Sequence, residues 1–237
     1  MRILVVANDG DADTGHVGAR LCARVPDAEF TTLVRERHDE WPPIAPPASR
    51  SARPTEMLLI LGSSWSVHWP RLAREVEAEC ALIRTAQAAD TPILAICYGA
   101  QIAARALGGD AMPADRPEIG WCGVGAAPGT DAPVAGEWFQ WHVDTFAPPP
   151  GAAVLASSPS GPQAYRLGRT LATQFHPEVT LDVVERWAAD ASDALPTRLG
   201  ARPADLVAAT RERDRGNAAA AARLVDWFLD EVATAAR

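Results

Sequence analysis

The feature that most constrains the fold is segment 92–108, PILAICYGAQIAARALG, which changes from strand to helix with no loop between them. Its first half is a short apolar run typical of a buried strand, and its Ala-rich second half favours a helix. The change falls at Ile96-Cys97-Tyr98-Gly99. The segment therefore predicts a tight strand-to-helix turn with Cys97 at its tip, the geometry of a nucleophile elbow.

A thiol at such a turn has a special electrostatic environment. The free N–H groups and the positive dipole end of the following helix stabilise both a thiolate and an oxyanion. The alternative is that Cys97 is a buried free cysteine at the end of a strand, since unpaired cysteine is among the most buried residue types. The turn alone does not decide between a catalytic and a structural thiol.

A second segment far downstream, Thr173-Gln174-Phe175-His176-Pro177-Glu178, favours the catalytic interpretation. Pro177 keeps the segment extended, and residues two apart in an extended segment face the same way. A cysteine nucleophile needs a base to hold its proton and a third group to orient that base. We therefore expect Cys97 to be the nucleophile, His176 the general base and Glu178 the orienting carboxylate of an acyl-transfer reaction.

Two other patterns compete with this site. His142 and Asp144 are also two residues apart, and so form a rival base and orienter. Loop 9–15, DGDADTG, follows the first strand and invites a nucleotide or calcium site, but it lacks G-x-G-x-x-G, a Lys-Ser/Thr pair and the final carboxylate of a calcium loop. The loop is predicted to be a solvated turn.

The composition fits one compact enzyme domain spanning residues 1–237. The chain has 237 residues with 48% hydrophobic content, enough to bury a large core, and α/β folds of this size are routinely one domain. Its net charge of −8 and pI of about 5.1 argue against a nucleic-acid partner, because a phosphate-binding protein presents a basic face.

The cysteines and the amino terminus bear on redox state and localisation. Cys22, Cys80, Cys97 and Cys122 contain no C-x-x-C pair and no spacing typical of a disulfide framework or a zinc site, so we expect no metal. Met1 leads directly into an apolar strand without a signal peptide, and no apolar run approaches a membrane span. These patterns predict a cytoplasmic protein that binds no membrane.

Strand and helix patterns alternate along the chain, which is typical of a parallel sheet covered on both faces. We predict an α/β fold of the flavodoxin-like, doubly wound kind, with a mostly parallel sheet, extra antiparallel strands after Gly109 and a helical C-terminal tail. The early elements are strands 3–7, 30–34 and 57–61, and helices 17–24 and 71–89. The later elements are strands 119–124, 137–141, 154–157, 163–167 and 170–175, and helices 180–191, 203–214 and 217–235. Segments 42–54 and 148–150 are predicted loops.

CYGAQ at residues 97–101 followed by FHPE at residues 175–178 resembles the class I glutamine amidotransferase domain. The pair of motifs is far more specific than either one alone. The resemblance extends to LLILG at 58–62, EIGW at 118–121 and QWHVD at 140–144. It is strongest to the stand-alone group that is similar to the amidotransferase half of GMP synthetase and to the plant γ-glutamyl peptidases.

The resemblance implies further site residues. Backbone N–H groups of Ser63 and Tyr98 would form the oxyanion hole, and Gly62, Gln101 and His142 would bind substrate. Gln101 is equally well explained as an ordinary helix residue, and His142 as a packing residue. The family usually has a second glycine and a proline where this chain has Ser63 and Ser64, so we expect a costlier backbone conformation in this loop.

The resemblance predicts a hydrolase that cleaves the γ-glutamyl amide bond of glutamine or of a γ-glutamyl conjugate through a Cys97 thioester. Its partner would be a small-molecule γ-glutamyl donor, and it would need no cofactor. One alternative is an ammonia-supplying subunit that is active only with a separate synthetase. Another is a non-catalytic amidotransferase-like binding protein. Serine at position 63, where the family usually has glycine, favours this alternative, whereas the presence of Cys97, His176 and Glu178 argues against it. A more distant cysteine-elbow family is disfavoured by the His-Pro-Glu sequence.

Overall fold

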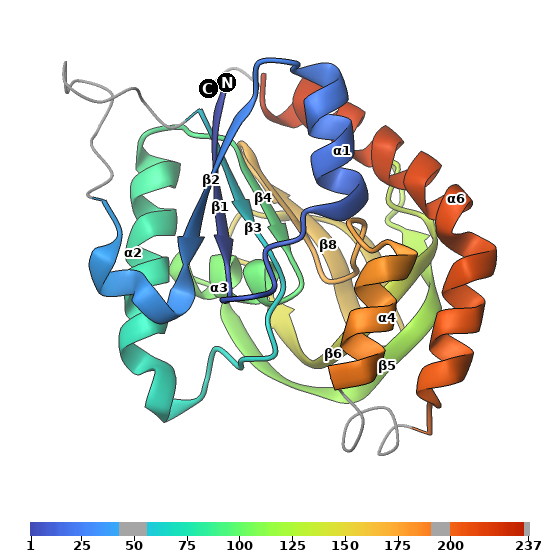
Figure 1. Cartoon of the computed structure of the whole chain (residues 1–237). Helices are drawn as coiled ribbons and strands as arrows, with labels where there is room; N and C mark the ends of the chain where they lie inside the picture. The colour runs from blue at the N-terminus through green and yellow to red at the C-terminus, as the bar shows by residue number, and fades with distance from the viewer. Residues whose placement is uncertain (43–55, 191–199, 235–237) are drawn as a thin grey trace.

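The computed structural model describes residues 1–42, 56–190 and 200–234 (Figure 1). A mixed sheet with strand order β2-β1-β3-β4-β9-β8-β7-β5-β6 forms its centre. The strands are β1 (Arg2–Ala7), β2 (Glu29–Val34), β3 (Met57–Ile60), β4 (Ile93–Ile96), β5 (Asp110–Ala126), β6 (Gly136–Ala147), β7 (Ala153–Ser158), β8 (Gly161–Leu167) and β9 (Thr170–Thr173). The helices are α1 (Gly15–Arg24), α2 (Ala73–Ala88), α3 (Tyr98–Ala106), α4 (Leu181–Asp190) and α6 (Pro203–Trp227), with 3-10 helices η1 (Arg35–Glu40) and η2 (Pro70–Leu72) and the π-helix η3 (Phe228–Val232).

The parallel half of the sheet brings the candidate site residues to one edge. β2, β1, β3, β4 and β9 run parallel to one another, with Ile60 opposite Ala95 and Ile96 opposite Thr173. Their carboxyl ends therefore meet at the same edge, where ligands bind in open α/β sheets. The segments that begin at Leu61, Cys97 and Gln174 all leave the sheet there.

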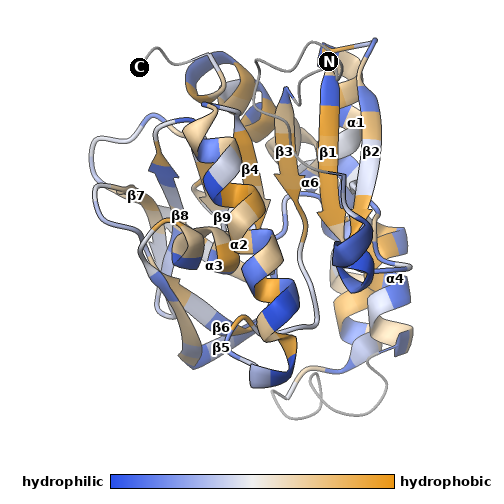
Figure 2. Ribbon diagram, turned by 90° about the vertical axis from the view of Figure 1, so that its left-hand side faces the viewer, coloured by the Kyte–Doolittle hydropathy of each residue, from blue (hydrophilic) through white to orange (hydrophobic). Residues whose placement is uncertain are grey.

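Both faces of β1, β3, β4 and β9 are buried, whereas the edge strand β2 is partly exposed. Leu4 and Val6 contribute to the core on one face, and Ile3 and Val5 to the core on the other. α2 and α3 cover the first face and α1 and α6 the second (Figure 1). Figure 2 shows β1, β3 and β4 as mostly hydrophobic, whereas hydrophilic and hydrophobic residues alternate along α2 and α4. Strands buried on both faces need a continuous apolar sequence, which explains the runs seen in β1, β3 and β4. The predicted α/β fold is confirmed.

The antiparallel half differs in detail from the prediction. The predicted strands 119–124 and 137–141 are parts of the longer strands β5 and β6. The pairing of β5 with β6 is irregular between Pro113 and Glu118. A proline has no N–H to donate to a sheet, so Pro113 and Pro117 argue against a strand, and the first half of β5 was not predicted from the sequence. β9 is antiparallel to β8 but parallel to β4, so the prediction that it is antiparallel holds on one side only.

The C-terminal tail also differs. The two predicted helices 203–214 and 217–235 are one continuous helix, α6, which extends into η3. Nothing lies within 4 Å of the position that a Gly216 side chain would take, and a single glycine in a helix costs only about 1 kcal/mol. α4 confirms the predicted helix 180–191 up to Asp190. Residues 43–55, 191 and 235 lie outside the described residues, so the predicted loop 42–54 is almost wholly outside them.

Segment 148–150 is a loop, as predicted. The assignment of residues 1–237 to one domain stays a prediction. Within the described ranges, every helix is too short or too polar to cross a bilayer.

The close approach of α3 to β3 gives a stability prediction. A Cβ atom at Gly99 would lie 2.4 Å from the carbonyl oxygen of Ile60, so Gly99→Ala must push the helix from the sheet. We expect the free energy of unfolding to fall by about 1–3 kcal/mol, as for other overpacked cores. Gly123→Ala is the matched control, because nothing lies within 4 Å of its new methyl group. Urea unfolding of both variants measures the difference, and equal midpoints would contradict the close approach.

Candidate active site

Cys97 occupies a strained turn between β4 and α3. Its backbone angles are φ 52° and ψ −111°, in a region that residues other than glycine rarely adopt. The Cys97 N–H donates to the carbonyl of Thr173 at 2.7 Å, and the Cys97 carbonyl accepts from the N–H of Gln101 at 3.1 Å. The predicted strand-to-helix turn is therefore present, and hydrogen bonds on both sides hold Cys97 at its tip.

His176 and Glu178 lie in the segment that follows β9. His176 Nδ1 lies 2.7 Å from Glu178 Oε1, and both side chains are 3% exposed. The backbone N–H of His176 donates to the carbonyl of Phe139 at 2.9 Å, which fixes the segment against β6. His176 Nε2 is buried and has no hydrogen-bond partner among the described residues. One ring nitrogen is thus held by a carboxylate while the other remains available.

The electrostatic environment favours the protonated form of His176. Burial by itself lowers the pKa of the imidazole, but the Glu178 carboxylate and the negative charge of the Cys97 sulfur outweigh it. Together they hold the pKa of His176 well above its usual range near 6.5. An imidazole in this environment can retain a proton taken from a nearby thiol.

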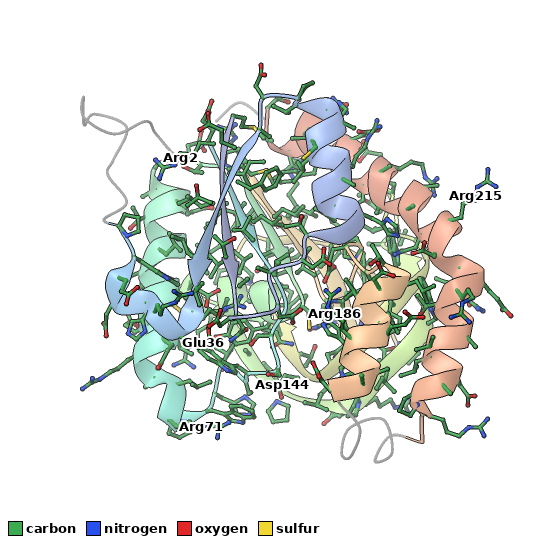
Figure 3. The ribbon with its side chains drawn as sticks, in the orientation of Figure 1. Arg2, Glu36, Arg71, Asp144, Arg186 and Arg215 are labelled. Carbon is green, nitrogen blue, oxygen red and sulfur yellow. The ribbon has the colours of Figure 1, made fainter. Side chains whose placement is uncertain are left out.

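Cys97 and His176 open into a common cavity of about 620 Å³. Its walls come from the loop after β1, η1, the loop after β3, the turn after β4, β6, the segment after β9, and α4. Figure 3 labels two of its residues, Glu36 and Arg186, on the face of the molecule shown there. The lining residues are Asn8, Asp9, Gly10, Asp11, Glu36, Ser63, Ser64, Trp65, Cys97, Trp141, His176, Arg186, Trp187 and Asp190.

The loop after β3 packs directly against the candidate catalytic residues. A Cβ atom at Gly62 would lie 3.0 Å from His176 Cε1 and 3.6 Å from Cys97 Cβ, so a side chain here would require the His176 ring to shift by a few tenths of an ångström. Ser63 lines the cavity, and its hydroxyl accepts from the N–H of Trp65 at 3.0 Å, which forms a local turn.

The expected backbone cost at Ser63 is absent. Among the described residues, Asp90 and Cys97 are the only residues other than glycine with a positive φ. Ser63 therefore adopts an ordinary backbone conformation, and the expectation of a costlier one was wrong. The assignment of Ser63 and Tyr98 to the oxyanion hole stays a prediction.

Gln101 and His142 do not reach the cavity lining. Gln101 is 2% exposed, and its Nε2 donates to the carbonyl of Asp144 and to Gln174 Oε1, both at 3.2 Å. His142 Nδ1 lies 2.8 Å from the Asp144 carbonyl, and its Nε2 lies 3.3 Å from Glu118 Oε2. The structure thus gives both side chains packing contacts behind the cavity, and their role in substrate binding stays a prediction.

The rival pair does not form a base and an orienting carboxylate. His142 contacts the backbone carbonyl of Asp144, whereas the Asp144 carboxylate accepts a hydrogen bond from the Ser66 hydroxyl. The i, i+2 spacing is the same as that of His176 and Glu178, but here both residues lie within β6 and the carboxylate faces another partner.

Sequence reasoning missed Gln174 as a member of the site. Its side chain is fully buried, and its Nε2 donates to Cys97 Sγ at 3.5 Å. A signal for it was present, because Gln174, His176 and Glu178 are spaced two apart in one extended segment and so face the same way.

Sequence reasoning also missed that α4 and loop 9–15 contribute to the cavity. The Trp187 ring packs edge-on against the His176 ring, with centroids 5.1 Å apart, and Trp187 Nε1 donates to Asp11 Oδ1 at 3.2 Å. The loop predicted to be a solvated turn contributes Asp9, Gly10 and Asp11 to the cavity. No local pattern indicates these neighbours, because tertiary packing alone brings α4 to the loop.

The charge of Glu178 gives a testable prediction. Glu178→Gln removes the carboxylate that raises the pKa of His176, so that pKa should fall, as measured by NMR titration of the imidazole nitrogens. A raised folded-state pKa stabilises the fold fully below the unfolded value of about 6.5, and this contribution is lost as pH rises through the folded value. The free energy of unfolding should therefore depend less on pH in Glu178→Gln than in the wild type.

Glu185→Gln is the control for this measurement, because Glu185 is an exposed residue of α4 that pairs with Arg211. It should leave the His176 titration unchanged. An unchanged titration in Glu178→Gln as well would show that the pair does not set the protonation of His176.

Comparisons with known proteins agree with this geometry. The family model for "Glutamine amidotransferase class-I" matches residues 68–186, just over half of the chain. The GMP synthase [glutamine-hydrolyzing] of Neisseria gonorrhoeae is 37% identical over 100 residues, which cover 38% of this chain and 19% of that protein. The Aeropyrum pernix protein of the same name is 32% identical over 143 residues, covering 55% of this chain and 28% of that protein. The matches thus span about a fifth to a quarter of these relatives.

Two crystal structures share the fold over nearly the whole chain. A glutamine amidotransferase from Thermotoga maritima superposes with a TM-score of 0.79 at 22% identity, covering 98% of this chain and 99% of that one. A glutamine amidotransferase from Methylobacillus flagellatus superposes with a TM-score of 0.79 at 23% identity, covering 98% and 94%. The family-model match, supported by this common fold, shows that the chain belongs to the class I glutamine amidotransferase family.

Proposed function

We propose that the protein hydrolyses the γ-glutamyl amide bond of glutamine or of a γ-glutamyl conjugate through a thioester on Cys97. One observation carries this proposal: His176 is held by Glu178 through Nδ1, while its unpaired Nε2 is buried at the cavity that also contains Cys97. This arrangement supplies a nucleophile, a base with one free nitrogen, and a carboxylate that orients the base.

In the first half of the reaction, the Cys97 thiol gives its proton to His176 Nε2 and the sulfur attacks the carbonyl carbon of the γ-amide. The oxygen of the tetrahedral intermediate becomes an oxyanion, which accepts hydrogen bonds from the N–H groups of Ser63 and Tyr98. The C–N bond then breaks, and the leaving amine takes the proton from the His176 imidazolium. The product is a γ-glutamyl thioester.

In the second half, His176 Nε2 accepts a proton from water, and the resulting hydroxide attacks the thioester carbon. The C–S bond breaks, the sulfur regains a proton from His176, and glutamate leaves with a free γ-carboxylate. Gln174 Nε2, 3.5 Å from Sγ, is placed to donate a hydrogen bond to the sulfur in both halves. These steps use side chains, backbone N–H groups and water.

The names of the related proteins favour a second function. The matched proteins are GMP synthases that hydrolyse glutamine, and the matched part covers a minor share of each. By analogy, this chain would supply ammonia to a separate synthetase and would be active only in its presence. The same Cys97 chemistry would serve both functions, and dependence on a partner distinguishes them.

The experiment is to measure release of ammonia or free amine from glutamine and from a panel of γ-glutamyl amides by the purified protein. We expect turnover of at least one donor, and a loss of about 10³-fold or more in Cys97→Ala, because the covalent intermediate cannot form. Cys22→Ala, which removes an exposed thiol, should keep full activity.

If the wild type is inactive alone and becomes active when a synthetase is added, the result would contradict hydrolysis by the lone protein and support the supply of ammonia to a synthetase. If the wild type is inactive both with and without the synthetase, the result would contradict both enzyme functions and support a non-catalytic binding protein.

A further inference from the structure

The cavity at Cys97 has room for more than a glutamyl side chain. Its volume of about 620 Å³ lies within the range of about 300–1,000 Å³ that holds drug-sized ligands. Cys97 and His176 occupy part of its wall, and the remaining walls extend over the loop after β1, η1 and the end of α4. The chemistry of those walls therefore bears on the amine half of the amide substrate.

Aromatic rings form one side of the cavity. Trp65, Trp141 and Trp187 line it, and the rings of Trp141 and Trp187 lie edge to face with centroids 5.9 Å apart. Trp187 also packs against His176, so this aromatic wall begins directly beside the reacting atoms. Indole faces attract ammonium groups through their negative electrostatic potential.

Carboxylates form the outer part of the cavity, and we call Asp9, Asp11, Glu36 and Asp190 the acidic rim. Arg186 also lines the cavity, and its Nη2 donates to Asp13 Oδ2 at 2.9 Å. Because Asp13 lies outside the lining, the positive charge of Arg186 is paired there and not with the acidic rim.

Neutral donors hold much of the acidic rim in place. Glu36 accepts from Asn8 Nδ2 at 2.7 Å and from the N–H of Asp9 at 2.9 Å, and Asp11 accepts from Trp187 Nε1. Asp9 lies 3.7 Å from Arg37, an exposed residue outside the lining. The cavity mouth therefore carries an excess of negative charge beside an aromatic wall.

We propose that the substrate is a γ-glutamyl amide whose amine half carries a second, positively charged amino group, that is, the conjugate of an aliphatic diamine or polyamine. This inference rests on the proposed function. The glutamyl half lies at Cys97 and forms the thioester. The ammonium end of the leaving amine lies between the aromatic wall and the acidic rim, where both attract it.

The test compares three γ-glutamyl amides of nearly equal length, made from 1,4-diaminobutane, n-pentylamine and 4-aminobutyrate. The first two differ only in exchanging a terminal ammonium group for a methyl group. We expect kcat/KM for the diamine conjugate to exceed that for the pentylamide by about tenfold and to exceed that for the anionic conjugate by more. Added salt should reduce this preference, because exposed charges are screened.

In Glu36→Gln/Asp190→Asn the ratio of kcat/KM between the diamine and pentyl conjugates should fall toward one. Asp182→Asn/Glu185→Gln is the charge-matched control, because it removes two carboxylates of α4 that lie outside the cavity lining, and it should keep the wild-type ratio. Equal turnover of the three amides by the wild type, or an unchanged ratio in the double variant, would overturn the inference while leaving the proposed function intact. Turnover of none of them, nor of glutamine, would instead overturn the proposed function.

A separate observation concerns the buried residue Arg35, the first residue of η1. It is 1% exposed, and its guanidinium makes a double hydrogen bond to Glu79, at 2.9 and 3.2 Å. The same group donates through Nη2 to the carbonyl of Leu61 at 2.7 Å and through Nη1 to the carbonyl of Gly62 at 3.0 Å. One buried cation thus holds two successive carbonyl groups of the loop after β3.

The hydrogen bond to the Gly62 carbonyl fixes the direction of the Ser63 N–H group. In a planar trans peptide, the carbonyl of one residue and the N–H of the following residue point in opposite directions. The described residues contain no cis peptide bond. Because the Gly62 carbonyl faces Arg35, the Ser63 N–H faces away from Arg35. Ser63 lines the cavity whereas Arg35 does not, so an N–H that points away from Arg35 can face the cavity, as an oxyanion donor must.

The Arg35 guanidinium also lies over the ring of Tyr98, with Cζ 4.7 Å from the ring centroid. Tyr98 carries the second expected oxyanion donor. We infer that Arg35 is a positioning residue that holds both halves of the oxyanion hole, and this inference also rests on the proposed function.

The test replaces the buried pair as a unit, because removing Arg35 alone would leave the Glu79 charge buried and unpaired. In Arg35→Met/Glu79→Met we expect a lower melting temperature, because the buried carbonyls of Leu61 and Gly62 lose their donor. In the folded variant we expect kcat to fall about 10–100-fold, with KM changed less than about twofold. Alkylation of Cys97 by iodoacetamide should keep its wild-type rate, because that reaction develops no oxyanion. Arg84→Met/Glu77→Met removes an exposed pair on α2 and is the control.

Arg35→Lys provides a second variant if the double variant does not fold. It keeps a charge opposite Glu79 but cannot hold two carbonyl groups with one fork, so it should fold and lose kcat. A wild-type kcat in either folded variant, or a parallel loss of alkylation and kcat, would overturn the inference. An inactive wild type would overturn the proposed function on which it rests.

Discussion

The hydrogen bond from the Cys97 N–H to the carbonyl of Thr173, at 2.7 Å, joins the two strand ends on which the site depends. β4 delivers the thiol, and β9 delivers Gln174, His176 and Glu178. The residues of these two strands are far apart in sequence but adjacent in the sheet, where Ile96 lies opposite Thr173. With the strand ends in register, Cys97 Sγ lies 3.5 Å from Gln174 Nε2, in the segment that carries the imidazole.

Close packing then limits what surrounds this hydrogen bond. A Cβ atom at Gly99 would lie 2.4 Å from the carbonyl oxygen of Ile60, and a Cβ atom at Gly62 would lie 3.0 Å from His176 Cε1. Both glycines serve close approach, and neither is among the glycines with a positive φ. Arg35 orients the loop after β3 by donating hydrogen bonds to the carbonyls of Leu61 and Gly62. Small residues and one buried cation thus set the geometry of the loop beside the thiol.

The sequence predicted the parts of the site that depend on local pattern. The turn at Cys97, the extended segment at His176 and the buried parallel strands were all recognisable because each has a period or a break of its own. The predicted backbone cost at Ser63 was wrong, since Ser63 is not among the described residues with a positive φ. The break predicted within α6 was also wrong, because packing supports a helix that local propensity around Gly216 disfavours.

By itself, the sequence determined the α/β fold, the strand-to-helix turn and the pairing of His176 with Glu178, because these follow from hydrophobic periodicity and from residues two apart in one extended segment. The tertiary structure alone decided which side chains meet around Cys97. The acidic rim, the Trp187 ring against His176 and the Arg35 hydrogen bonds join residues from η1, α4 and the loops after β1 and β3. Contacts of this kind depend on how strands and helices pack, and no local pattern along the chain encodes them.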